Sequence, residues 1–174
     1  MYSLLKHVDT LTSICPGVFD DEYRQFYVRF NEPTHVKYLK IGILPRMANP
    51  GTAPDIVSEL AELVHNPNVK LGRLAVQSMG KIACGGNGGD GAAESIARRL
   101  VEMMDSNLPH VSSEAATALT LMVRKEPSIK TLVAPPLVRV LKYMSEPSGK
   151  ASVIILLGEC GDLVREAPYA LEKL

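Results

Sequence analysis

The segment His65-Asn66-Pro67-Asn68-Val69-Lys70 places a polar residue and a proline directly before a long stretch of periodic apolar residues. Similar turns occur at 31–37, 107–112 and 145–150. Their prolines, Pro33, Pro67, Pro109 and Pro147, are 34, 42 and 38 residues apart, and the longest interval contains a glycine-rich insertion. A period of about 40 residues with helices inside it is typical of HEAT-type or armadillo-type solenoids. The sequence therefore predicts an all-α, solenoid-like fold.

Helical periodicity follows these prolines. Apolar residues recur at three- and four-residue steps over 71–83 and over 111–122. Proline suits a helix start, because a first-turn residue has no intrahelical partner for its N–H and the proline φ is already helical. The apolar run Val153 to Leu157 predicts a helix that is buried on most sides.

Further helices are predicted at 2–14, 20–30, 36–48, 55–64, 92–104, 131–144 and 167–174. Pro45 should kink one of them, and Pro135-Pro136 should break another. No run alternates apolar and polar residues as a strand does. Because both ends resemble halves of helix pairs, we expect residues 1–174 to form a single piece of a longer α-solenoid.

Composition excludes several classes of function. Nineteen basic and nineteen acidic residues cancel, which disfavours general binding to nucleic acid. The chain has no Trp, and 5% aromatic residues argue against a stacking platform for bases or sugars. No signal peptide or apolar run of membrane-spanning length is present, so we expect a soluble, cytosolic protein with peripheral membrane contact at most.

No residue pattern predicts catalysis, a cofactor or a metal. Gly86, Gly88 and Gly91 match G-x-G-x-x-G, but a helix rather than a strand is predicted before them, which favours a loop. The four histidines are scattered, and Cys15, Cys84 and Cys160 lack metal-ligand or redox spacing. We expect the cysteines to be buried or inert thiols in a reducing compartment.

Three lysines form the one candidate site. Lys37, Lys70 and Lys150 each lie three or four residues after a repeat proline. If the repeats stack in register, these lysines line one basic edge that faces an acidic partner or a phospholipid surface. A solvated ridge is the alternative interpretation.

Several segments together resemble one family. The run from Phe26 to Lys37, with its Asn31-Glu32-Pro33 turn, resembles the trunk of the β-type large subunits of heterotetrameric clathrin-adaptor (AP) complexes. The segment 69–83, with Met79-Gly80-Lys81-Ile82-Ala83, is similar to the next helix of that trunk. The segment 154–161, with Gly158-Glu159, is similar to its hydrophobic Gly-Glu helix. The segment 166–172 is closest to the β subunit of the fourth adaptor complex, whereas Pro45 and the insertion at 85–91 depart from the pattern.

The resemblance implies a right-handed αα-superhelix, as part of an adaptin N-terminal trunk that acts as a non-enzymatic scaffold in cargo sorting. Its partners would be a second large chain, a medium chain and a small chain, on trans-Golgi or endosomal membranes. An Arf-type GTPase would bind through parts outside this sequence, and clathrin involvement is left open. The alternatives are another helical-repeat scaffold (coatomer subunit, nuclear transport receptor or phosphatase scaffold) or an enzyme with a site at the glycine-rich loop.

Overall fold

The computed structural model describes residues 2–15, 17–86, 88–89 and 91–172, and these form helices and connecting turns without a strand. The chain divides into two compact units, Met1–Ala92 and Ala93–Leu174. The α-helices of the first unit are α1 (Tyr2–Ile14), α2 (Thr34–Ile43), α3 (Ala53–Leu63) and α4 (Val69–Gly85). Those of the second are α5 (Ala92–Met104), α6 (Pro109–Lys125), α7 (Lys130–Val133), α8 (Leu137–Tyr143), α9 (Pro147–Glu159) and α10 (Ala167–Leu171). Three 3₁₀ helices add η1 (Asp20–Phe26), η2 (Leu44–Arg46) and η3 (Pro127–Ile129).

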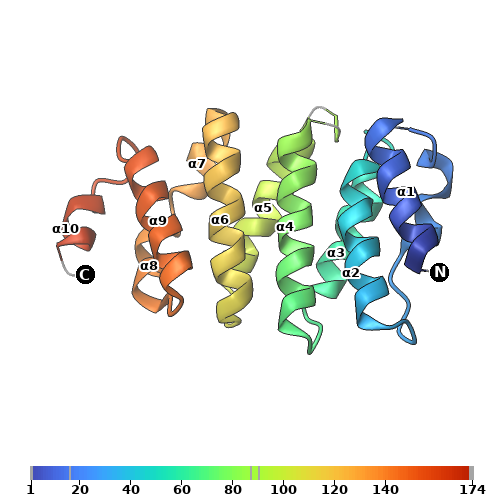
Figure 1. Ribbon diagram of the computed structural model, residues 1–174. Coiled ribbons are helices and arrows are strands. Elements are labelled where there is room, and N and C mark those ends of the chain that lie inside the picture. Colours follow the sequence, from blue (N-terminus) through green and yellow to red (C-terminus); the bar gives the residue numbers. More distant parts are fainter. Residues whose placement is uncertain (1, 16, 87, 90, 173–174) are drawn as a thin grey trace. The chain divides into compact units, whose positions relative to one another are not determined.

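The first unit has two layers. Helices α1, α2 and α4 lie side by side, and α3 packs behind α4 (Figure 1). Each helix contributes a stripe of apolar side chains, so the core of this unit contains Ile41, Ile56, Leu60, Leu71 and Met79. Asn49 fixes the turn that leads into α3. Its side-chain oxygen accepts hydrogen bonds from the backbone N–H groups of Gly51 and Thr52.

The second unit is held by a close contact between α6 and α9, with α8 packed on α9 (Figure 1). Small and hydroxylated residues line this contact. The hydroxyls of Ser113 and Ser148 lie 3.0 Å apart, as do those of Thr117 and Ser152. At Gly149 a Cβ atom would meet the Ser113 Cα at 2.9 Å, so this position requires glycine for the two helices to approach so closely.

Two predictions about proline are confirmed. Pro135-Pro136 separates α7 from α8, and Pro109 and Pro147 stand in the first turns of α6 and α9. Pro33 and Pro67 instead lie just before their helices, because Pro33 is the N-cap of α2 and Pro67 precedes Asn68, the N-cap of α4. Pro45 acts differently from the prediction, because α2 ends at Ile43 and Pro45 lies in the following η2 instead of kinking a longer helix. Proline has no N–H to continue the helical hydrogen bonds, so the chain changes to a short 3₁₀ turn.

Two other helix predictions were wrong. The segment 20–30 forms a 3₁₀ helix that ends at Phe26, and its buried side chains, Tyr23 and Phe26, have the three-residue spacing of that helix. The run 153–157 is not buried on most sides, since Ile154 and Ile155 are 37% and 41% exposed. Helices α6 and α8 cover one side of α9, which leaves these two isoleucines on the other side.

Candidate partner-binding surfaces

The three predicted lysines are divided between the two units. Lys70 is exposed in the first turn of α4, and Lys37 is half-buried in α2. The starts of these two helices are joined, because the Tyr38 hydroxyl lies 3.3 Å from Asn68 Oδ1, its hydrogen-bond acceptor. Lys150 is half-buried in the first turn of α9, in the second unit. Lys37 and Lys70 therefore lie at the same end of two neighbouring helices. The basic edge that would include Lys150 as well stays a prediction.

The loop before α2 is fixed by a buried ion pair. Lys40, which is 2% exposed, donates from Nζ to Glu32 Oε1 at 2.5 Å and to the Tyr27 carbonyl at 3.0 Å. Glu32 Oε2 accepts from the backbone N–H of Arg29 at 3.0 Å. Burial raises the pKa of Glu32, but the hydrogen bonds from Lys40 and Arg29 and the charge of Lys40 outweigh it and place that pKa below its ordinary value of 4.5.

This loop presents an aromatic side chain beside Lys37. Phe30 is 94% exposed, and the Lys37 ammonium lies 5.8 Å from the centre of its ring. The same ammonium donates to the Phe30 carbonyl at 2.8 Å. A cation over an aromatic face is attracted by the ring quadrupole, so this contact and the hydrogen bond orient Lys37.

A hydrogen-bonded cluster around Asp55 joins η1 to α3 in the first unit. Asp55, in the first turn of α3, accepts from the Tyr23 hydroxyl at 2.6 Å and from Arg24 at 3.1 Å. These two hydrogen bonds lower the pKa of Asp55. Burial, followed by the charges of Tyr23 and Asp55, raises the pKa of nearby Tyr27 to about 12. Asp55 therefore stays ionised at neutral pH beside the Arg24 cation, and Tyr27 stays protonated.

The glycine-rich stretch is a connection between helices. α4 ends at Gly85, Gly86 follows in the left-handed conformation of a helix cap, and α5 begins at Ala92. Asn87 and Asp90 lie outside the described residues. A dinucleotide site needs a strand before this motif, and the structure has a helix there, so the predicted loop is confirmed.

The described part of the chain holds no cluster suited to a metal ion, because its His, Cys, Asp and Glu side chains form no group of three that could bind one. None of its helices has the length and apolar character needed to cross a bilayer. A hollow of about 400 Å³ in the second unit lies between the end of α5 and the end of α8, where Arg139 pairs with Asp105. Ser106, on its lining, has no hydrogen-bond partner for its hydroxyl among the described residues.

Comparison with known proteins adds the family. The Adaptin N terminal region family matches residues 2–174. The chain belongs to this family. Among curated relatives, an Arabidopsis thaliana adaptin, "Beta-adaptin-like protein A", is 30% identical over 99% of the chain, and the human "AP-1 complex subunit beta-1" is 26% identical over 99%. The chain spans 20% and 18% of the lengths of these two adaptins.

A similarity to one known structure supports the fold. A chain in the "Homology model of the full-length AP-3 complex in an intermediate open conformation" matches 97% of this chain with a TM-score of 0.78 and 21% identity. The match covers 28% of that chain. At this identity the similarity shows the fold alone, and it confirms the predicted all-α solenoid class.

Proposed function

We propose that the chain is a trunk segment of a β-type large subunit of an adaptor complex, and that it acts as a non-enzymatic scaffold in vesicle-mediated protein transport. The family match over residues 2–174 carries this proposal. Relatives named as β subunits of AP-1, AP-2 and AP-3 complexes support the β type. The mechanism is one of shape, because stacked helices present an extended surface that holds partners over a large area.

The partners in this proposal are a second large chain, a medium chain and a small chain. The complex would be peripheral on trans-Golgi or endosomal membranes, with an Arf-type GTPase bound by parts outside this sequence. The segment 166–172 supports assignment to the fourth adaptor complex. Cargo would be sorted by the assembled complex, and no residue of this chain is assigned to a cargo signal.

The test is affinity purification of the full-length protein from its own cells, with mass spectrometry of the copurified proteins. We expect a second large, a medium and a small adaptor chain in equal amounts, and their identities would name the complex. Coatomer subunits, nuclear-transport cargo or a phosphatase catalytic chain would instead discard the adaptor function while leaving the fold unchanged.

The basic edge of Lys37, Lys70 and Lys150 is a second, separate proposal. These lysines would contact an acidic partner or a phospholipid surface, as their common position after the repeat prolines suggests. Replacing all three by Glu should weaken both partner copurification and liposome association. If both stayed unchanged, the lysines would form only a solvated ridge.

A further inference from the structure

The charges of the first unit are segregated between its two layers. The sequences of α2 and α4 contain no Asp or Glu, and the one carboxylate of α1, Asp9, pairs with Arg46. In contrast, η1 and α3 carry six carboxylates, namely Asp20, Asp21, Glu22, Asp55, Glu59 and Glu62. Their one basic residue, Arg24, pairs with Asp55. The formal charge of zero for the whole chain therefore conceals a basic layer and an acidic layer.

The basic side chains of α4 lie on one stripe of the helix. Lys70, Arg73 and Lys81 are separated by three and eight residues, which places them on the same side of an α-helix. Leu71, Ala75 and Ile82 point into the core, and Lys70 and Lys81 are exposed. At 1.5 Å per residue, the stripe from Lys70 to Lys81 is about 16 Å long.

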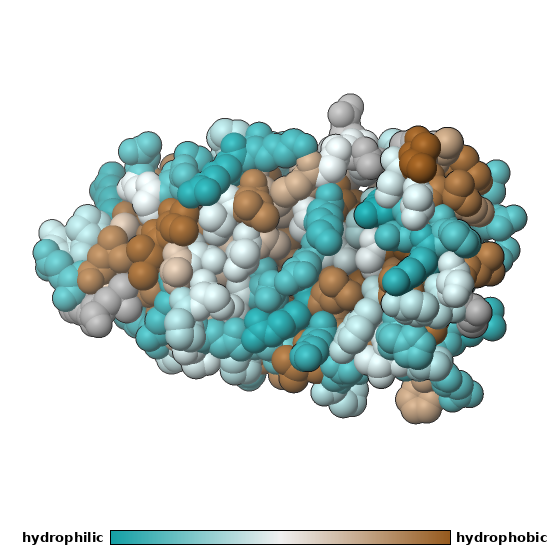
Figure 2. Space-filling model, in the orientation of Figure 1, coloured by the Kyte–Doolittle hydropathy of each residue, from teal (hydrophilic) through white to brown (hydrophobic). Residues whose placement is uncertain are grey.

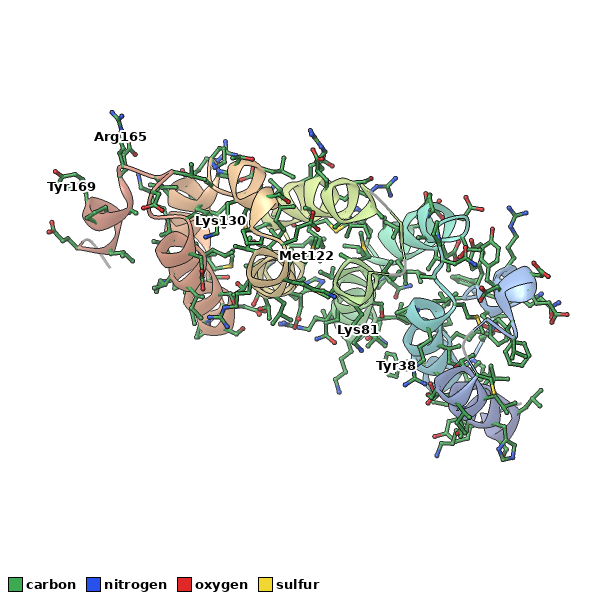
Figure 3. All side chains as sticks on the ribbon, turned by 90° about the horizontal axis from the view of Figure 1, so that it is seen from above. Tyr38, Lys81, Met122, Lys130, Arg165 and Tyr169 are labelled. Atoms are coloured by element: carbon green, nitrogen blue, oxygen red, sulfur yellow. The ribbon has the colours of Figure 1, made fainter. Side chains whose placement is uncertain are left out.

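Helix α2 adds to this stripe. Figure 3 shows Tyr38 of α2 and Lys81 of α4 on the same side of the first unit. Lys37 lies in the first turn of α2, and the hydrogen bond from the Tyr38 hydroxyl to Asn68 joins α2 to the start of α4. Lys37 therefore lies near the end of the stripe that begins at Lys70. In Figure 2, hydrophilic side chains cover much of the length of α4. We call the surface formed by Lys37, Lys70, Arg73 and Lys81 the α2–α4 basic face.

We propose that the α2–α4 basic face binds an acidic segment of a partner protein that lies along α4. The stripe is long and narrow, so its shape matches that of an extended peptide or a helix. The acidic layer repels such a segment while the basic layer attracts it, so the charge pattern fixes which side of the unit the segment meets. The inference rests on the charges of this unit and not on the adaptor function.

A protein segment suits this face better than a lipid surface does. Surfaces that enter the lipid interface combine basic residues with bulky apolar ones. Among the described residues of α2 and α4, only Val69 is a large exposed apolar side chain. Phe30 is exposed in the loop before α2, with the Lys37 ammonium 5.8 Å from the centre of its ring, so one aromatic side chain lies at the end of the face and none along it. In the test below, vesicle binding without peptide binding would therefore contradict the proposal.

The experiment measures fluorescence anisotropy of a labelled peptide of alternating Glu and Ser with the full chain. A second arm measures cosedimentation with vesicles of phosphatidylcholine and phosphatidylserine. We expect the peptide to bind, and its affinity to fall as salt rises from about 50 to about 300 mM, because salt screens exposed charges. The variant Lys37→Glu with Lys70→Glu and Lys81→Glu should bind the peptide about tenfold more weakly.

A matched control changes charge elsewhere. Arg99→Glu with Lys142→Glu and Arg165→Glu makes the same change of formal charge in the second unit, and we expect it to keep the affinity within about twofold. Circular dichroism would check folding, and Lys→Gln substitutions at positions 37, 70 and 81 would give a smaller loss if the Glu variant unfolds. An equal loss in the control, vesicle binding without peptide binding, or binding of neither probe would overturn the proposal.

Discussion

Lys40 is a charged residue placed in the interior of the first unit, where its ammonium is bonded to Glu32 and to the Tyr27 carbonyl. Burying a charge is costly unless it is paired and hydrogen-bonded, and here both conditions are met. The pair connects α2 to the loop that presents Phe30 beside Lys37. A single residue pair therefore supports one end of the α2–α4 basic face.

Removing the ammonium should destabilise the first unit. We expect Lys40→Met to lower the free energy of unfolding by about 3 kcal/mol, because Glu32 would remain largely buried without a cation. Urea denaturation followed by circular dichroism would measure it. Adding Glu32→Gln to this variant should recover most of the loss, and a double variant as unstable as the single one would show that the charge is not the cause.

The same pair predicts a dependence on pH. The folded-state pKa of Glu32 lies below its ordinary value of 4.5, so its ionised form contributes stability above pH 4.5. This contribution is lost as the pH falls through the folded-state pKa. The stability difference between the natural chain and Glu32→Gln should therefore shrink below about pH 4.5. A difference that stayed constant from pH 7 to about pH 3 would contradict this assignment.

The cysteines should differ in reactivity. Cys15 is exposed, whereas Cys160 is buried, and burial raises the pKa of the Cys160 thiol. Since the thiolate is the reactive form, we expect a thiol reagent at pH 8 to modify Cys15 rapidly and Cys160 only after unfolding. Cys15→Ser should remove the rapid phase from the absorbance trace. A rapid phase that persisted in this variant would assign the reactivity to another thiol.

At the scale of elements, the contact between α6 and α9 depends on small side chains. The hydroxyls of Ser113, Thr117 and Ser152 form hydrogen bonds across the contact or within their own helix. The backbones of α6 and α9 can therefore approach closely without leaving these polar groups unpaired. Gly149 allows the closest approach. The opposite side of α9 is apolar and exposed, and Figure 2 shows hydrophobic side chains over this helix.

Two glycines of α9 provide a matched pair of substitutions. Gly149→Ala should lower stability by about 1–3 kcal/mol, because its Cβ would meet the Ser113 backbone at 2.9 Å and the Met144 sulfur at 2.6 Å. Gly158→Ala should raise stability by about 0.5–1 kcal/mol, since nothing lies within 4 Å of that Cβ and alanine favours the helix. Thermal unfolding would compare them, and equal shifts of the same sign would exclude close packing as the cause.

At the scale of the whole molecule, the chain is two compact units that together span about a fifth of the adaptin relatives. A scaffold distributes its contacts over a large area, so one exposed side chain should contribute little. We expect Arg165→Ala to change stability by less than about 0.5 kcal/mol. Copurification of the adaptor chains that we propose as partners should stay within about twofold by quantitative mass spectrometry. Loss of all partners in this variant would instead reveal a concentrated binding site.

The sequence by itself determined most of the helices and indicated the family. Apolar periodicity and proline positions are local, so they predicted the starts of α3, α6 and α9 and the break at Pro135-Pro136. Lys37 and Lys70 were found from their distance to the repeat prolines. Lys81 was missed as a site residue, although its spacing from Lys70 along an acid-free helix was available in the sequence.

Only the tertiary structure decided which side chains meet. The burial of Lys40 against Glu32, the exposure of Ile154 and Ile155, and the need for glycine at 149 each depend on which helices lie side by side. The separation of charge into two layers depends on the same arrangement, because a net charge of zero contains no information on position. Helix pairing joins residues that are distant in the sequence, and local periodicity cannot specify those contacts.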